Sequence, residues 1–233
     1  MLNRVSISVC ITCCNLEKYL EECLESIAAQ TMPPTEVIIV HDGCEKSWSY
    51  GGAVNLFRQQ NRGVARSRHE AVLLAQSDNI LFVDADDILN EQFIQLMINA
   101  RLEHPEGILY PNVINLHRWG ESKNRNEWAE SVDTVSYATM YSRCPIVISS
   151  LIPKKVYEEV RGFDPTLKLY EDWDFHFKVF ELGYEFIKVP QAVLKYRSRS
   201  KGRNKADADL RNEMFYEVQG RHLPPEAYEK KST

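Results

Sequence analysis

Short, mostly apolar runs alternate with helical patterns over the first 84 residues, and this alternation constrains the fold more than any other feature of the sequence. The apolar runs are residues 5–11, 37–40 and 80–83, with a weaker one at 55–58, and the helical patterns are residues 15–28 and 64–75. A run that is apolar throughout is typical of a strand that is covered on both faces, as in a parallel sheet. This order predicts an α/β layered fold, with Asn15 as the N-cap of the first helix.

The second half of the sequence is less regular. The elements expected there are a helix at 90–101 capped by Asn90, extended segments at 108–116 and 146–152, a polar loop at 117–131, a helix at 172–182, and strands at 184–189 and 192–196 separated by Pro190. Gly183 is expected to end the helix at 172–182, because glycine readily adopts the left-handed conformation found there. Leu210, Met214 and Val218 recur at the spacing of one helical face, which predicts a last helix.

Charge and cysteine content exclude several classes of protein. The 233 residues suffice for one full core. Lys and Arg number 28 against 33 Asp and Glu, a net charge of −5, so no global positive field predicts binding to nucleic acid. No apolar run approaches the ~20 residues of a membrane-spanning helix, and the first twelve residues have the pattern of a strand, not of a signal peptide. Six cysteines without paired spacing favour a reducing, cytoplasmic setting.

Two of these cysteines, Cys10 and Cys13, form a C-x-x-C. Cys10 lies inside an apolar strand, and the sequence has no second pair at zinc-site spacing. These thiols are therefore expected to be buried or to line a site, in preference to redox chemistry.

Three carboxylates, Asp84, Asp86 and Asp87, directly follow the apolar run at 80–83. Side chains so close together repel one another unless a cation or hydrogen-bond donors compensate them, and oxygen ligands of this kind suit Mg²⁺ or Mn²⁺. Ligands of open α/β sheets also bind beyond the carboxyl ends of the strands. The alternative is a solvated turn that caps the following helix.

Two further segments follow strands or open helices in the first half. His41, Asp42 and Gly43 follow the apolar run at 37–40, and an Asp there can accept a hydrogen bond from a ribose or a base. The alternative is an ordinary Asp-Gly turn. Residues 61–68 bring three arginines to the start of a helix, which suits a phosphate. The alternative there is a solvated helix face.

Two segments in the second half have similar alternatives. Glu171, Asp172 and Asp174 open a helix, so one of them is a candidate general base, with Trp173 as a wall for a flat or sugar ligand. Acidic first turns also simply complement the helix dipole. From Lys195 to Arg203 every second residue is basic, so an extended chain presents all five charges on one side, toward a pyrophosphate or an anionic membrane surface. The alternative is a charge-protected edge strand.

Taken in order, these motifs resemble glycosyltransferase family 2, whose members have the GT-A fold. The matching stretches are residues 12–15 with 19–31, residues 36–44, Asn61-x-Gly63 with Ser67-Arg68-His69, Asp84-Ala85-Asp86, residues 161–164 and Glu171-Asp172. The resemblance covers residues 5–196. It implies a Rossmann-like, mostly parallel sheet with helices on both faces, in a single domain at 1–200. Within this domain, residues 1–100 form the nucleotide-binding half and residues 101–200 the acceptor half. Residues 201–233 follow the domain as a polar tail that contains the last helix.

The resemblance also implies a function: inverting transfer of a hexose-type sugar from a nucleotide donor, foremost a UDP-sugar, to a glycan or lipid-linked acceptor. Asp172 is then the catalytic base, and Glu171 and Trp173 bind the acceptor. Asp84 and Asp86 hold Mn²⁺ or Mg²⁺. The residues implied in donor binding are Thr12, Cys13, Asp42, Arg68, Asp84, Asp86 and Arg199.

Several positions depart from the family pattern. His41 stands in place of an Asp, Cys13 and Cys14 in place of Thr and Tyr, and Cys44 in place of Ser. The family's usual C-terminal metal-binding His is missing, and Arg199 is its expected substitute. Two alternatives therefore stand beside the transferase: a catalytically weak nucleotide-sugar-binding module, and a nucleotidyltransferase, which would release pyrophosphate in place of a nucleoside diphosphate. Contact of the basic segment with a membrane is a further alternative.

Overall fold

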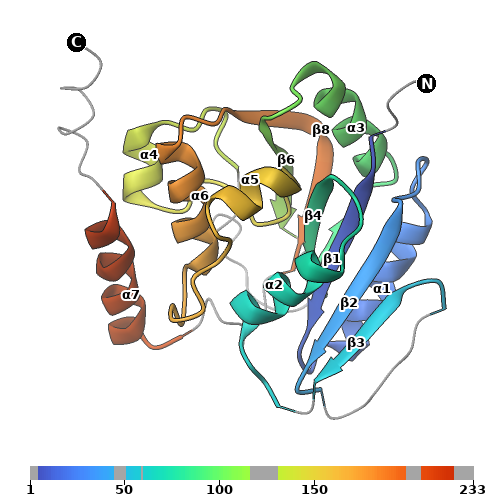
Figure 1. Cartoon of the computed structure of the whole chain (residues 1–233), viewed down its shortest axis with the longest axis horizontal. Helices are drawn as coiled ribbons and strands as arrows, with labels where there is room; N and C mark the ends of the chain where they lie inside the picture. Colours follow the sequence, from blue (N-terminus) through green and yellow to red (C-terminus); the bar gives the residue numbers. More distant parts are fainter. Residues whose placement is uncertain (1–4, 45–50, 59, 116–130, 198–205, 223–233) are drawn as a thin grey trace.

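The computed structural model describes residues 5–44, 51–58, 60–115, 131–197 and 206–222 (Figure 1). Within them one sheet of eight strands has the order β3-β2-β1-β4-β7-β6-β8-β5. The strands are β1 (Ile7–Cys13), β2 (Glu36–Asp42), β3 (Val54–Arg58), β4 (Asn79–Asp84), β5 (Ile88–Leu89), β6 (Ile108–Asn115), β7 (Leu151–Pro153) and β8 (Phe186–Tyr196). The helices are α1 (Glu17–Ala28), α2 (Val64–Leu74), α3 (Phe93–Glu103), α4 (Tyr137–Ser142), α5 (Lys154–Glu159), α6 (Glu171–Glu181) and α7 (Ala208–Arg221).

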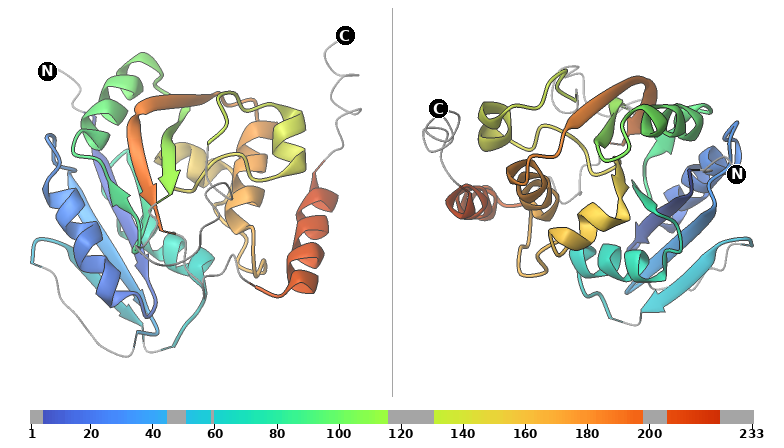
Figure 2. Two further views of the ribbon diagram at one scale, coloured as in Figure 1. Left: turned by 180° about the vertical axis from the view of Figure 1, so that it is seen from behind. Right: turned by 45° about the horizontal axis from the view of Figure 1, so that its top comes forward.

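The sheet is mostly parallel and is covered on both faces. β1 pairs in parallel with β2 and β4, β2 with β3, and β6 with β8, while β7 and β5 run antiparallel to their neighbours. Side chains of β1, β2 and β4 alternate between two cores, one shared with α1 and α3 and the other with α2 and α5. From behind, α1 lies in front of β1 and β2 (Figure 2). The predicted architecture is therefore confirmed, and we call these two sides the α1 face and the α2 face.

The bounds of some helices and strands differ from the sequence expectations, because contacts with residues far along the chain determine them. Asn15 adopts a left-handed conformation (φ 54°) and Leu16 is the N-cap of α1. The third helix begins at Phe93, because the Asn90 side chain instead accepts a hydrogen bond from Val193 N at 2.9 Å. Pro190 does not divide two strands: it lies in a bulge of β8, where its missing N–H leaves no ladder bond unmade.

The predicted last helix is present as α7, with Met214 and Val218 buried in a cluster that includes Trp173 and Phe177. The sequence placed this helix in a polar tail, whereas the structure packs it against α6 (Figure 1). In the described part of the chain, no helix has the length and apolar character needed to cross a membrane.

Candidate active site

Most of the predicted donor residues gather at the carboxyl ends of β1, β2 and β4. Thr12 is the register partner of Asp84. Because side chains alternate along a strand, Thr12, Asp42 and Asp84 follow the residues that pack on the α2 face. Cys13 and His41 follow those that pack on the α1 face. The strand ends therefore present two different sets of chemical groups on the two sides of the sheet.

Asp42 holds the loop that leads into α2. Its two carboxylate oxygens accept hydrogen bonds from the backbone N–H groups of Arg62 (2.8 Å) and Gly63 (2.9 Å). The side chain is buried. The sequence predicted that Asp42 would bind the nucleoside directly; in the structure its hydrogen bonds fix the loop at 61–63, and the direct contact stays a prediction.

Arg68 joins the two halves of the molecule. From α2 it donates to Asp84 Oδ1 at 2.8 Å and to Glu171 Oε1 at 2.9 Å, across 103 residues of sequence. Burial alone would lower the pKa of Arg68, but the charges of Asp84 and Glu171 outweigh it and raise that pKa above its ordinary value. The guanidinium therefore stays charged and binds the carboxyl end of β4 to the first turn of α6.

The turn after β4 concentrates negative charge. Burial, and then the charges of Asp84 and Asp86, raise the pKa of Asp87 well above its ordinary value. Arg197, at the end of β8, offsets part of this charge: its backbone N–H donates to Asp87 Oδ1 and its Nε to Asp86 O, both at 3.0 Å. Sequence reasoning assigned Arg197 only to a row of alternating charges, because its partners lie about 110 residues upstream.

The carboxylates fit a hard divalent cation by charge and by ligand type. Carboxylate oxygens are the ligands that Mg²⁺ and Mn²⁺ prefer. The pKa of Asp87 is raised first by burial and then by the charges of Asp84 and Asp86, so negative charge is concentrated in this turn. Among the described residues, Asp84, Asp86 and Asp87 do not form a group in which one oxygen of each lies within 4.8 Å of the other two. An ion held by one or two carboxylates together with substrate phosphates, the usual arrangement for Mg²⁺, is compatible with this geometry.

Asp172 lies in the first turn of α6, where its Oδ1 accepts from Trp173 N at 2.9 Å. Burial, and then the charges of Asp87, Asp84, Asp86 and Asp172, raise the pKa of the Tyr196 hydroxyl. The Tyr196 hydroxyl therefore lies in the electrostatic field of both the acidic turn and Asp172, the candidate base. Sequence reasoning missed Tyr196, because nothing in the local pattern distinguishes it from a strand residue.

Trp173 is not a wall of the site. Its side chain is 1% exposed, and its indole N–H donates to Met140 O at 2.7 Å. The prediction that it binds an acceptor is therefore wrong: packing of α4 and α7 turns this face of α6 inward. Glu171 is also buried and paired with Arg68, so the structure gives it a positioning role in place of the predicted acceptor contact.

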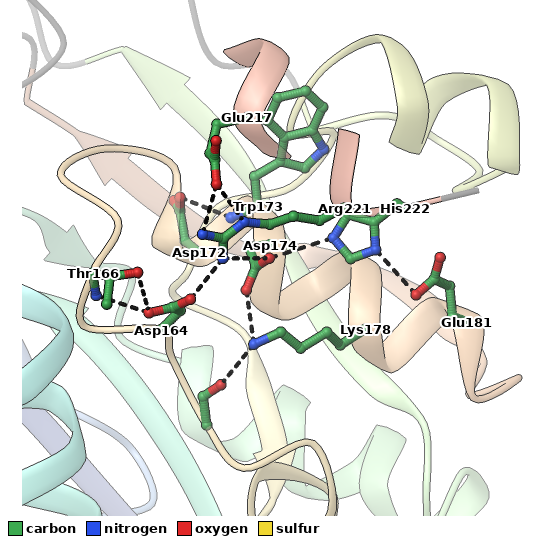
Figure 3. A network of polar contacts seen from close by, with 11 residues as sticks. Asp164, Thr166, Asp172, Trp173, Asp174, Lys178, Glu181, Glu217, Arg221 and His222 are labelled. Carbon is green, nitrogen blue, oxygen red and sulfur yellow. Dashed lines mark hydrogen bonds and ion pairs between the residues drawn. The ribbon is translucent and has the colours of Figure 1, made fainter. Parts of the chain in front are cut away.

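A network of charged side chains beside Asp172 links α7 to α6 (Figure 3). Arg221 donates to Asp164 Oδ2 at 2.6 Å and lies 3.7 Å from Asp174. His222 lies 3.0 Å from Glu181 and 3.4 Å from Asp174. Burial alone would lower the pKa of His222, but these two carboxylates raise it above its ordinary 6.5.

Arg199, expected to replace the missing histidine, lies outside the described residues. A surface hollow of 660 Å³ between α1 and β5, lined in part by Glu22, Glu25 and Lys195, includes none of the predicted site residues.

The sequence pattern of glycosyl transferase family 2 matches residues 8–170. The chain is 26% identical to the glycosyltransferase GlyA of Streptococcus pneumoniae over 223 residues, which are 85% of this chain and 31% of GlyA. It is 26% identical to the poly(ribitol-phosphate) β-N-acetylglucosaminyltransferase TarS of Staphylococcus aureus, over 91% of this chain and 39% of TarS. It is 28% identical to the uncharacterized glycosyltransferase YwdF of Bacillus subtilis, over 88% of this chain and 79% of YwdF.

Solved structures agree on the fold. The structure of S. aureus TarS 1–349 in complex with UDP-GlcNAc superposes with a TM-score of 0.69 at 22% identity, covering 91% of this chain and 64% of that one. This chain spans 31–39% of the length of the first curated relatives. The likeness confirms the predicted GT-A architecture, and the pattern match covers well over half of the sequence. The chain therefore belongs to glycosyl transferase family 2.

Proposed function

We propose that this chain transfers a sugar from a nucleoside diphosphate donor to an acceptor hydroxyl with inversion at the anomeric carbon. The observation that carries the proposal is the Arg68 bridge, which pairs with Asp84 on one side and Glu171 on the other. It holds the acidic turn, where a diphosphate and its cation would sit, beside the helix start that carries Asp172. A transferase needs these two regions together, because donor and acceptor react across the space between them.

The donor is proposed to be a UDP-sugar bound beyond the carboxyl ends of β1, β2 and β4. The titles of related structures support this class, since TarS 1–349 was solved with UDP and with UDP-GlcNAc. Thr12 is proposed to line the site, together with the loop at 61–63 that Asp42 holds. Cys13 and Arg199 remain predictions as donor contacts. The acceptor, proposed to be a glycan or a lipid-linked sugar, would approach from the side of α6.

Asp84 and Asp86 are the residues proposed to hold Mn²⁺ or Mg²⁺. When bound, such an ion offsets the negative charge that grows on the leaving diphosphate. Arg68 adds a fixed positive charge at Asp84 and limits how far that carboxylate can turn. Arg197 stabilises the conformation of the turn through its hydrogen bonds to the Asp87 carboxylate and the Asp86 carbonyl oxygen.

Asp172 is proposed to accept the proton of the acceptor hydroxyl as that oxygen attacks the anomeric carbon from the face opposite the diphosphate. Its place in the first turn of α6 favours the ionised carboxylate, since the helix dipole stabilises negative charge there. A single displacement needs one base and no protein nucleophile. The proton stays on Asp172 Oδ until solvent removes it.

The second candidate, a nucleotide-sugar-binding module with little turnover, rests on Asp42. Its carboxylate is engaged by backbone N–H groups, and the neighbouring positions carry His41, Cys13 and Cys44. The module and the transferase differ in turnover alone. A nucleotidyltransferase differs from both in releasing pyrophosphate. Membrane contact through residues 198–203 stays a prediction, because those residues lie outside the described part of the chain.

The test compares the parent protein with Asp172→Asn and with a matched control, Asp133→Asn, whose exposed carboxylate pairs with Lys188 at 2.7 Å away from the site. A panel of nucleotide sugars is incubated with Mn²⁺, and released nucleoside diphosphate and pyrophosphate are quantified. We expect Asp172→Asn to bind UDP as the parent does and to lose roughly 10²–10⁴-fold in turnover, the usual contribution of a general base. Unchanged turnover in folded Asp172→Asn protein would remove Asp172 from this role, and release of pyrophosphate would replace the proposed reaction.

A further inference from the structure

Two cysteines and a histidine that depart from the family pattern meet on the α1 face of the sheet. One ligand atom from each of Cys13, His41 and Cys44 lies within 4.8 Å of the others. Cys13 and His41 are register partners at the ends of β1 and β2. The chain then reverses at Gly43 (φ 71°), where a Cβ would lie 2.6 Å from Asn61 N. This turn brings the Cys44 thiol to 3.1 Å from Cys13 O.

The imidazole of His41 is held in an orientation that suits a metal ligand. Asn55 Nδ2 donates to Ala53 O at 2.9 Å, which turns Asn55 Oδ1 toward His41 Nε2 at 3.4 Å. The ring also stacks on Phe57, with centroids 4.4 Å apart. Because Nε2 then carries the proton, the lone pair of Nδ1 is directed at the Cys44 sulfur, 4.0 Å away. Histidines that bind metals are usually oriented by such a second hydrogen bond to a carbonyl oxygen.

A carboxylate lies near these groups, outside the set of three ligand atoms that are all within 4.8 Å of one another. Glu17 is the first residue of α1. Burial is the largest cause that raises the pKa of the Cys13 and Cys44 thiols, and the nearby Glu17 carboxylate raises both further. Its Oε1 is buried and accepts no hydrogen bond from any residue that the structure describes. A buried carboxylate oxygen without a donor is costly, and a bound cation would satisfy it.

We propose that Cys13, His41 and Cys44 bind a zinc ion, and that the Glu17 side chain turns toward it so that Oε1 becomes the fourth ligand. Thiolate and imidazole ligands select zinc over Mg²⁺ and Mn²⁺. In a tetrahedral zinc site the S and N ligand atoms are about 3.5 Å apart, given bonds of about 2.3 and 2.0 Å. The 4.0 Å between Cys44 Sγ and His41 Nδ1 is close to that spacing. Binding displaces the two thiol protons to solvent.

The zinc site does not rest on the proposed sugar transfer. It lies on the α1 face, whereas Asp84 and Arg68 lie toward the α2 face. Its ligands come from β1 (Cys13), from β2 and the turn after it (His41 and Cys44) and from the start of α1 (Glu17), so the ion would tie three elements together at the edge where the donor is proposed to bind. The sequence alone did not predict it, because spacing singled out Cys10 as the partner of Cys13. Cys10 points to the opposite face.

The test measures zinc content and cobalt substitution on the whole chain purified under reducing conditions. We expect one zinc per chain. The metal-free protein titrated with Co²⁺ is expected to show the near-ultraviolet charge-transfer band of sulfur bound to cobalt. Cys44→Ser should abolish the band, and Asn55→Ala, which removes the orienting carbonyl together with the bond to Ala53 O but none of the proposed ligands, should weaken zinc affinity by about 10–100-fold.

Two matched variants should keep the zinc and the band. Cys144→Ser removes a thiol that donates to Ile146 O elsewhere in the molecule, and Asp86→Asn alters the proposed site for the hard cation. The proposal is overturned if the parent binds cobalt without the sulfur band. Equal zinc binding by Cys44→Ser also overturns it, as does a thiol count showing a Cys13–Cys44 disulfide in the purified protein.

Discussion

Replacing Arg68 with Met removes the charge that joins the two halves of the candidate site while keeping most of the aliphatic stem. The Arg68 side chain is 4% exposed and that of Glu171 is 3% exposed, so the substitution leaves the Glu171 carboxylate buried without its cation. Removing one partner of a buried pair costs about 3–5 kcal/mol. Asp84 adds little, because its side chain is 35% exposed and regains water. For a chain of this size the melting temperature should fall by roughly 6–20 °C.

A double-mutant cycle separates this pairing from general damage to packing. Glu171→Gln retains an acceptor for Arg68 and leaves the Asp84 pair in place, so it should cost about 1.5–3 kcal/mol. In Arg68→Met/Glu171→Gln neither buried charge remains, and the free energy of unfolding, measured by urea titration, should exceed the additive value by at least about 1 kcal/mol.

The matched control is Arg62→Met, which breaks the exposed Arg62–Glu70 pair (3.0 Å) and should cost less than about 1 kcal/mol. If the two substitutions at Arg68 and Glu171 add within about 0.5 kcal/mol, the bridge does not hold the halves together and the reasoning fails.

Three further outcomes are expected. Asp86→Ala should weaken UDP binding in calorimetry far more with Mn²⁺ than without it, and equal weakening in both conditions would contradict the metal assignment. Because the pKa of His222 is raised above 6.5 by Asp174 and Glu181, its stabilisation is complete below pH 6.5 and is lost as the pH rises through the folded pKa. Parent protein should therefore lose more unfolding free energy between pH 6 and 9 than His222→Gln, and parallel profiles would refute this. Trp173→Phe should cost about 1–3 kcal/mol through the lost bond to the Met140 carbonyl; an acceptor KM that rises with unchanged stability would restore Trp173 to the site.

The position of a candidate site residue could be predicted from the sequence where that residue directly follows an apolar run. Asp84 is the last residue of β4 and Asp86 lies just beyond it, because a buried apolar run ends where the chain leaves the core. Asp172 lies at the start of a helix for a similar local reason, since the acidic first turn and Gly183 mark both ends of α6. Local pattern did not reveal which of these side chains already have partners. Asp42 looked available for a nucleoside, and the structure shows it bound to backbone 20 residues away.

By itself the sequence determined the α/β class, the order of the first strands and helices, and membership of a glycosyltransferase family. These follow from hydrophobic periodicity and motif order, which are properties of neighbouring residues. Only the tertiary structure decided that Arg68 pairs with Glu171, that Trp173 is core, and that Cys13 lies with His41 and Cys44 rather than with Cys10. The physical reason is shared: periodicity tells which face of its own element a side chain occupies, whereas its partner depends on which distant element packs against that face.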